Sequence, residues 1–568
     1  MKFINKKIIA ELLKKYIKNF TIDEIESLIE IPPSNKNFNF AFPCYRLAQH
    51  EKKAPDIIAK DLELKITLPD YIDKIEADGP YINIRIKPSV ILNNIFELKE
   101  EYGKISTEEK NRPLRIVIEY PSPNTNKPLH LGHVRNMLIG STSSNLLKYL
   151  GHKVFQVNLN NDRGIHICKS MLAYKKWGND QVPHIKSDHF VGQFYVKYSE
   201  EEEKDESLSD EIKTMLMLWE QKDPEIRQLW EKMNNWALNG FKETYKKFNI
   251  SFDKEYNESE FYWKGKEKIL EGLEKGIFEK REDGAIIASL KERKGLQDKI
   301  LLRSDGTSIY ITQDIFLAYL KKQDFNYDRS IYVVGNEQDL YFKQLFAILD
   351  LLGFKEDKFH FSYGMISLPE GKMKSREGKV VDADDIVEEM HQLAYEEINN
   401  RYPTLSEEEK NYRADIIGKS AIRFFILKFN PKSDFIFNPN DSISFEGETG
   451  PYIQYCYARI ESIILKSDQK IDLDVNFDLL NHEKELDLIK YLYIFPELVE
   501  QVANNYNIHL IPQYLLNLCQ SFNSFYDTCR VISDDKNIEK VRILLIKCVQ
   551  IVIKIGLKLL GIETLEKM

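Results

Sequence analysis

The chain has 568 residues, enough for several domains, and its 43% hydrophobic and 30% charged residues are typical of soluble globular proteins. It contains no run of about 18 apolar residues, which argues against a membrane span, and its net charge of −9 disfavours nonspecific coating of nucleic acid. The six cysteines are scattered and none forms Cys-x-x-Cys, so a zinc site and a disulfide framework are disfavoured, and reduced cysteines in a cytoplasmic protein fit best.

Residues 1–110 are predicted to form a separate small α/β domain. Helical periodicity covers Ile8–Phe20, which we interpret as an amphipathic helix rather than a targeting peptide. A second helix is expected over Ala54–Leu62. The segment Tyr81–Ile86 alternates in hydrophobicity directly after the turn signal Asp78-Gly79-Pro80, and this pattern predicts a strand.

Residues 111–400 have the pattern of an α/β domain with a parallel sheet. Three strand-like runs, Arg115–Tyr120, Val154–Leu159 and Ile331–Val334, are separated by helical stretches, as expected when crossover helices connect parallel strands. The charged, tryptophan-containing segment 177–300 is interpreted as an insertion between two halves of this domain.

Residues 401–568 are expected to be mostly helical. Apolar residues recur at helical spacing in Ile416–Phe429, in Tyr455–Lys466 and in Val541–Leu560. No internal repeat or low-complexity linker interrupts this part, so we expect one helical domain.

The segment Ser122–His133 carries the clearest chemical signal, because it joins the first strand-like run of the α/β domain to a predicted helix over Leu131–Leu150. A helix N-terminus favours phosphate through its unpaired N–H groups and partial positive charge. His130 and His133 lie about one turn apart and can donate hydrogen bonds to oxygens that gain charge in a transition state. Gly132 lets a ligand approach the backbone closely. The alternative is an ordinary loop–helix junction with polar caps.

The string His-x-Gly-His resembles the nucleotide-binding signature of class I aminoacyl-tRNA synthetases, and the longer string Ser-Pro-Asn-x-x-Lys-x-x-His-x-Gly-His resembles the arginyl-tRNA synthetase version. Downstream, Gly371–Lys379 resembles the Lys-Met-Ser-Lys-Ser loop of the same class, although an exposed charged turn is the alternative. Lys372 keeps the first lysine of that loop, whereas Ser375 stands where the second is usual. Arginyl enzymes often differ here, and the resemblance implies that Lys127 compensates.

The resemblance implies two sets of residues around ATP. The catalytic set is Lys127, His130, His133 and Lys372. The ATP-binding set is His130, Gly132, His133, Lys372, Met373 and Ser375.

A pocket specific for arginine must offer carboxylates and other acceptors to a planar cation with five N–H donors. Tyr310 and Asp314 share a face if their segment is helical, and they match an arginyl family motif. The resemblance implies that Asp314 and Glu119 meet the guanidinium group and that Asn124 holds the α-amino end. Taken one at a time, these residues have ordinary structural explanations. The complete implied arginine-binding set is Glu119, Ser122, Asn124, His133, Tyr310, Asp314 and Gln338.

The segment Ser444–Ile460 resembles part of the anticodon-binding domain of arginyl enzymes, which implies that Tyr452, Tyr455 and Arg459 contact tRNA. Packing of the tyrosines in a helical core is the alternative. Two short N-terminal strings, Phe-Pro-Cys-Tyr at 42–45 and Gly-Pro-Tyr-Ile-Asn at 79–83, resemble the extra domain with which that family contacts the tRNA elbow. A generic accessory domain explains them equally well.

The resemblance implies a multidomain enzyme. Its parts are an α/β N-terminal accessory domain (1–110) that contacts tRNA, a class I Rossmann-type α/β catalytic domain (111–400) with an insertion, and an all-α C-terminal anticodon-binding domain (401–568). The implied reaction joins arginine to ATP, releases pyrophosphate and transfers arginine to the 3′ end of its tRNA. ATP is expected with Mg²⁺, without zinc or protein metal ligands, in a cytoplasmic monomer.

Three alternatives stay open at this point. The first is another class I synthetase, although cysteinyl enzymes expect zinc-ligand cysteines that this chain lacks. The second is a nucleotidyl transferase that acts without tRNA, which would not need the C-terminal helical domain. The third is a non-catalytic RNA-binding paralogue, which the retained histidines, Lys372 and Asp314 argue against.

Overall fold

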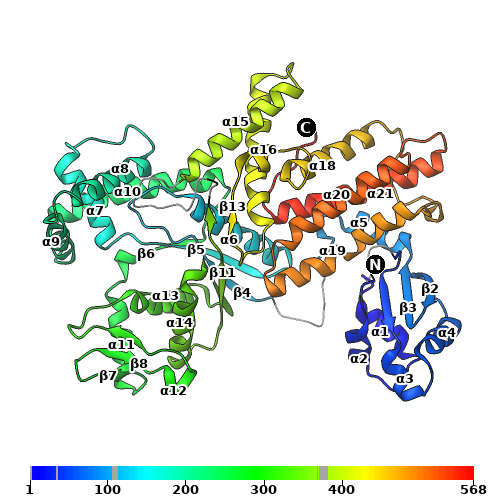
Figure 1. Ribbon diagram of the computed structural model, residues 1–568, viewed down its shortest axis with the longest axis horizontal. Coiled ribbons are helices and arrows are strands. Elements are labelled where there is room, and N and C mark those ends of the chain that lie inside the picture. Colours follow the sequence, from blue (N-terminus) through cyan, green and yellow to red (C-terminus); the bar gives the residue numbers. More distant parts are fainter. Residues whose placement is uncertain (1–2, 33–35, 105–112, 368, 370–380) are drawn as a thin grey trace.

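A computed structural model describes residues 3–32, 36–104, 113–367, 369 and 381–568. Figure 1 shows a central parallel sheet, a helical body and a smaller α/β body on one side of it, C-terminal helices on the other side, and the N-terminal domain beside those helices. Within the described residues, no helix combines the length and the apolar character needed to span a membrane.

The N-terminal domain is built on an antiparallel sheet in the order β1-β3-β2. Its strands are β1 (Phe40–Pro43), β2 (Ile72–Asp78) and β3 (Tyr81–Ile86), and its helices are α1 (Lys6–Lys14), α2 (Ile22–Leu28), α3 (Tyr45–Glu51) and α4 (Pro55–Lys65). The predicted strand and second helix are confirmed. The first helix ends earlier than predicted, at Lys14, and a capping box of Thr21 and Glu24 starts a separate helix after it.

The middle part of the chain contains a sheet in the order β11-β10-β4-β5-β6, in which every pair is parallel. The predicted strands are confirmed as β4 (Arg115–Glu119), β5 (Lys153–Asn160) and β10 (Arg329–Gly335), and β11 (Asp357–Tyr363) extends one edge. Helices α6 (Leu131–Tyr149), α13 (Tyr310–Phe325) and α14 (Asp339–Leu351) connect or flank the strands. The carboxyl end of β4 therefore leads directly into the loop before α6.

The segment expected as one insertion is divided by a strand of the main sheet. β6 (Lys254–Asn257) pairs with β5 and forms the other edge of the sheet. Sequence patterning misses β6 because Tyr256 is its one buried residue. Before β6 lies a helical body, and after it lies a small α/β body. The helical body comprises α7 (Ile165–Trp177), α8 (Ser187–Glu202), α9 (Leu208–Glu220) and α10 (Pro224–Lys247). The small α/β body comprises η2 (Glu258–Glu260), α11 (Lys264–Glu274), β7 (Glu279–Lys280), β8 (Ile286–Ala288), α12 (Lys291–Lys294) and β9 (Lys299–Leu302).

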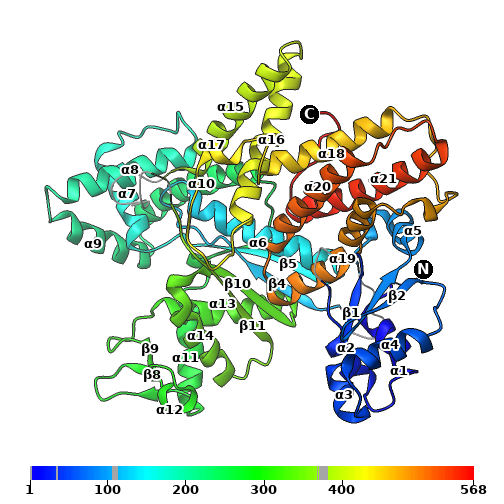
Figure 2. The same cartoon turned by 45° about the vertical axis from the view of Figure 1, so that its right-hand side comes forward.

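The C-terminal part is helical, as predicted. It comprises α15 (Ala383–Arg401), α16 (Glu407–Leu427), α17 (Pro439–Ser442), α18 (Gly450–Leu465), α19 (Glu483–Asn505), α20 (Leu510–Thr528) and α21 (Lys536–Leu559). The short strands β12 (Ile366–Ser367) and β13 (Phe435–Ile436) pair in parallel beside α6. Figure 2 shows α5 (Pro88–Leu98) next to α21, where it links the N-terminal domain to these helices.

Candidate active site

Two histidines close the first turn of α6 by accepting hydrogen bonds from the backbone. His130 is the N-cap residue, and its Nδ1 accepts from the N–H of Gly132 at 3.1 Å. The Nδ1 of His133 accepts from the N–H of His130, also at 3.1 Å. The two ring centroids are 3.9 Å apart. Because both Nδ1 atoms are acceptors, the proton of each neutral ring lies on Nε2, which is a donor.

Both histidines are neutral near pH 7. Burial, followed by the charge of nearby Lys127, lowers the pKa of His130 to about 4. Burial, His130 and Lys127 hold the pKa of His133 well below its usual range. The helix start therefore presents two uncharged imidazoles with N–H donors, which can bind phosphate oxygens without giving up a proton.

Gly132 is required for a reason that the sequence does not show. A Cβ at this position would lie 2.9 Å from Cε1 of His130, closer than such atoms approach in proteins. The sequence predicts that Gly132 makes room for a ligand, whereas the nearest atoms in the structure belong to the cap of the same helix. The glycine therefore makes room for the His130 ring.

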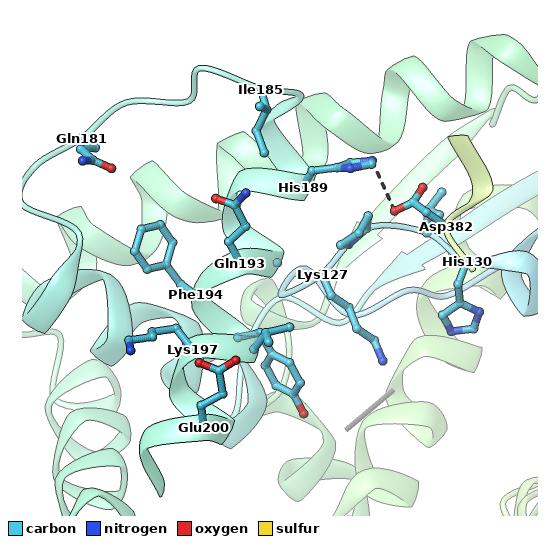
Figure 3. Close-up of a pocket in the computed structure, with 15 residues that line it drawn as sticks. Lys127, His130, Gln181, Ile185, His189, Gln193, Phe194, Lys197, Glu200 and Asp382 are labelled. Carbon is cyan, nitrogen blue, oxygen red and sulfur yellow. Dashed lines mark ion pairs between the residues drawn. The ribbon is translucent and has the colours of Figure 1, made fainter. Parts of the chain in front are cut away.

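A cavity of about 620 Å³ lies beside this helix start. Figure 3 shows Lys127, His130 and Asp382 on one side of it and residues of α8, including His189 and Lys197, along the other. Burial lowers the pKa of Lys127, and among the described residues no carboxylate forms an ion pair with this lysine. The lysine is thus available to an anion in the cavity.

Arg135, in the next turn of α6, is a buried anchor that sequence reasoning missed. Its guanidinium group donates to the carbonyl oxygens of Gly364 at 2.6 Å and Met365 at 2.9 Å. It also donates to the carbonyls of Pro431 at 2.9 Å and Ser433 at 2.8 Å, and it lies 4.6 Å from the ring centroid of Phe435. Arg135 thereby fixes β12 and β13 to α6.

The predicted ATP-loop residues that follow β12 lie outside the described residues: Lys372, Met373 and Ser375.

A second group of predicted residues meets between the end of β4 and α13. Glu119 is 8% exposed and forms an ion pair at 2.8 Å with Lys321, whose side chain is fully buried. Asp314 accepts a hydrogen bond from the hydroxyl of Tyr341, a residue of α14 that sequence reasoning missed. Burial, with the nearby charge of Glu119, raises the pKa of Asp314 to about 7. Among the described residues, Glu119 therefore already forms an ion pair with a cation, whereas Asp314 forms none.

The other predicted arginine-binding residues, apart from His133, lie at the start of α13, directly before α14 and in the loop after β4. Tyr310 begins α13, one turn before Asp314 as predicted, and is 74% exposed. Gln338 is exposed and ends η3 (Asn336–Gln338), directly before α14. Asn124 is exposed in the loop after β4, and Ser122 in the same loop has a left-handed backbone, with φ of +56°.

The predicted RNA-contacting residues lie on α18 and differ in their exposure and in their side-chain partners. Tyr455 is 37% exposed. The amide of Asn523 on α20 donates to the hydroxyl of Tyr452 at 2.8 Å and accepts from Arg459 at 3.2 Å. Arg459 also lies 4.5 Å from the ring centroid of Tyr526. Tyr455 is thus the most exposed of the three residues.

Three family models match consecutive parts of the chain. The arginyl tRNA synthetase N-terminal domain matches residues 4–86, the catalytic domain of class I (R) tRNA synthetases matches 91–439, and the DALR anticodon binding domain matches 453–568. The three matches follow the order of the N-terminal sheet, the parallel sheet and the C-terminal helices.

Full-length relatives agree with these models. The arginine–tRNA ligase of Treponema denticola is 44% identical over 99% of this chain and 98% of its own length. That of Bacteroides thetaiotaomicron is 41% identical over the whole of both chains. The solved arginyl-tRNA synthetase of Thermus thermophilus superposes with a TM-score of 0.83 at 25% identity, covering 99% of this chain and 98% of that one. Because these matches extend along nearly the entire sequence, the chain belongs to the arginyl-tRNA synthetase family of class I aminoacyl-tRNA synthetases.

Proposed function

We propose that this arginine–tRNA ligase carries out both steps of its reaction at the start of α6, with the arginine side chain directed toward Asp314. In the first step the arginine carboxylate attacks the α-phosphorus of ATP, and the bond to the β-phosphate breaks to release pyrophosphate. In the second step a hydroxyl of the terminal ribose of tRNA attacks the arginyl carbonyl, and AMP leaves. The chain contributes no nucleophile, so its part is positioning and charge stabilisation.

The observation that carries this proposal is the shared hydrogen-bonding pattern of His130 and His133. Both Nδ1 atoms accept from backbone N–H groups, which leaves both Nε2–H groups as donors held in fixed positions. Neutral donors of this kind stabilise the charge that develops on the α-phosphate without competing for a proton. We assign Lys127 to the departing pyrophosphate, because burial has already removed part of its hydration and no protein anion pairs with it among the described residues.

The remaining assignments rest on the sequence signature. Lys372 would act with Lys127 on the pyrophosphate, and Met373 and Ser375 would belong to the same loop. Mg²⁺ would enter with ATP on phosphate oxygens, which is its usual mode of binding in nucleotide-dependent enzymes. We include no zinc, because the six cysteines lack metal-ligand spacing. We also propose a monomer that works in the cytoplasm.

Selection of arginine is assigned to Asp314 and Glu119. The guanidinium group would ionise Asp314, while Glu119 keeps Lys321 on one oxygen and offers the other. Tyr310, Gln338, Asn124 and Ser122 would enclose the rest of the amino acid. An uncharged analogue would leave a buried carboxylate without its partner, so the pocket would reject it.

The test is charging of a bacterial tRNA pool with ATP and Mg²⁺, using each amino acid in turn. We expect acid-precipitable label with arginine alone. Charging with a different amino acid would keep the family but overturn the assignment of the Asp314 pocket. Binding of tRNA without any charging would overturn the proposed activity itself.

A further inference from the structure

Charged side chains of both signs meet beside the active-site cavity, where α8, α10 and the start of α15 come together. The group consists of Asp188, Asp382, Asp384, Lys186, His189 and Lys247. His189 and Asp382 line the cavity together with Lys127 and His130 (Figure 3). Neither the sequence signature nor the proposed reaction accounts for this charged group.

A lysine occupies the centre of the group. The Nζ of Lys186 lies 2.9 Å from a carboxylate oxygen of Asp188 and 2.7 Å from one of Asp384. Asp188, His189 and Asp384 have side-chain atoms close enough to bind a metal ion together. The ammonium group already supplies a cation between two of these ligands, so we assign no metal here.

His189 connects two carboxylates of α15 through one nitrogen. Its Nε2 lies 3.4 Å from Asp382 and 3.3 Å from Asp384. The three carboxylates of the group, Asp188, Asp382 and Asp384, carry three negative charges. The two lysines, Lys186 and Lys247, balance two of them, and the imidazolium form of His189 balances the third. Hydrogen bonding to Asp382 and then to Asp384 raises the pKa of His189 to about 10, so the ring is protonated near pH 7.

Asp382 also joins the start of α15 to the start of α6. Its neighbours pair with those of His130 as a short antiparallel bridge. The N–H of Ala383 donates to the carbonyl of Leu129 at 2.9 Å, and the N–H of Leu131 donates to the carbonyl of Val381 at 3.1 Å. The Asp382 carboxylate caps α15 through its other oxygen. A displacement of Asp382 would therefore be transmitted to the backbone that carries His130.

We propose that His189 is a positioning residue for arginine activation, which holds Asp382 in place so that the Nε2–H of His130 stays directed at the phosphate. The inference rests on the proposed role of His130. The charged and titratable groups around His189 come from each element that packs on it or lines the same cavity: Lys127, His130, Lys186, Asp188, Lys197, Glu200, Lys247, Asp382, Asp384 and Asp385.

The decisive test is a double-mutant cycle on pyrophosphate exchange with saturating tRNA. We expect His189→Gln to lower kcat by about tenfold, with KM for ATP and arginine changed less than about twofold, because misplacing a catalytic donor slows chemistry more than binding. In a His130→Ala background the same substitution should change kcat less than about twofold, since the residue through which it acts is gone.

The cycle separates the two claims. If His130→Ala has a normal kcat, the proposed role of His130 fails. If His130→Ala is slow but His189→Gln still costs about tenfold in that background, the positioning inference fails and the role of His130 stands. Lys247→Gln is the matched control, because Lys247 pairs with the Oδ1 of Asp384 at 2.7 Å, and among the described ion pairs none joins Lys247 to Asp382. We expect its kcat to stay within about twofold of the unsubstituted enzyme.

A second variant tests the same inference from the other partner. Asp382→Asn removes the carboxylate that His189 holds but keeps a side-chain oxygen that can cap α15. We expect its kcat to fall by about tenfold, as in His189→Gln, and combining the two substitutions should lower kcat by less than about twofold further. A normal kcat for Asp382→Asn would overturn the inference, even if His189→Gln does not fold.

Discussion

At the scale of single residues, the site depends on which groups are charged before substrate arrives. His130 and His133 are neutral because they are partly buried and share a helix start with Lys127. Asp314 lies at its midpoint near pH 7, because its carboxyl group is buried beside Glu119 and forms no ion pair among the described residues. The side of the site that we assign to the nucleotide is thus prepared in advance, whereas the side that we assign to arginine would be completed by the substrate.

Arginine binding should therefore depend on pH. Below about pH 7 Asp314 carries a proton in the free enzyme, and the guanidinium group must displace it. We expect KM for arginine to rise by up to about tenfold per pH unit below pH 7 and to level off above it. The measurement is KM in pyrophosphate exchange between about pH 5.5 and about pH 8.5.

Asp314→Asn is the control for this titration, because it cannot lose a proton. Its KM for arginine should be high and independent of pH. A constant KM below pH 7 in the unsubstituted protein would contradict the assignment of Asp314 to the guanidinium group.

At the scale of elements, α6 organises the catalytic domain through its first two turns. The first turn carries the histidines, and the second carries Arg135, whose guanidinium group satisfies four carbonyl oxygens of two separate segments. Sequence patterning predicted the helix and the histidines, because both depend on neighbouring residues. It missed Arg135, because its partners are more than 200 residues away, with separations of 229 to 298.

Loss of the Arg135 anchor should destabilise the catalytic domain. Arg135→Met leaves buried carbonyl oxygens without donors. We expect the free energy of unfolding of the catalytic domain to fall by about 3 kcal/mol or more. Urea unfolding followed by tryptophan fluorescence measures this difference. Lys148→Met is the control, since Lys148 is exposed in the last turn of the same helix and its loss should cost at most about 0.5 kcal/mol. Equal losses in the two variants would contradict the anchoring role.

Sequence patterns report on neighbouring residues and not on contacts between distant ones, and this difference decides which parts of the fold and the site can be predicted. Long periodic segments such as α18 and α21 and the apolar strands β4 and β5 are predictable, because each repeats its own hydrophobic pattern. β6 is not, since its burial rests on a single tyrosine. The contact of His189 with Asp384 spans 195 residues, and nothing local to either residue indicates the other.

At the scale of the whole molecule, the N-terminal domain is held against the C-terminal helices by α19. The hydroxyl of Tyr493 donates to the carbonyl of Ile4, and the Nζ of Lys490 donates to the carbonyls of Pro32 at 2.9 Å and Lys36 at 2.8 Å. These contacts connect the two parts of the chain that we assign to tRNA. Their relative position should therefore affect tRNA binding more than amino-acid activation.

Lys490→Ala tests this coupling. It removes the donor of the hydrogen bonds described to the carbonyls of Pro32 and Lys36. We expect KM for tRNA in charging to rise by roughly tenfold, with KM for arginine and ATP unchanged. Lys6→Ala is the matched control, because the ion pair of Lys6 with Glu497 at 3.2 Å crosses the same interface but is partly exposed and should contribute little. A proportional change in all three KM values would show that the substitution acts on the enzyme as a whole.

The two connections of α6 to later parts of the chain have a consequence for how length varies in this protein. Arg135 donates to the carbonyl of Gly364, and His130 forms a backbone bridge with Asp382. The chain between Arg135 and Gly364 therefore leaves the start of α6 and returns to it. Extra segments inserted in that interval would enlarge a closed excursion of the chain without separating its two ends. The small α/β body is such an excursion, and we expect that its length can change without moving Gly364 or Asp382 away from the start of α6.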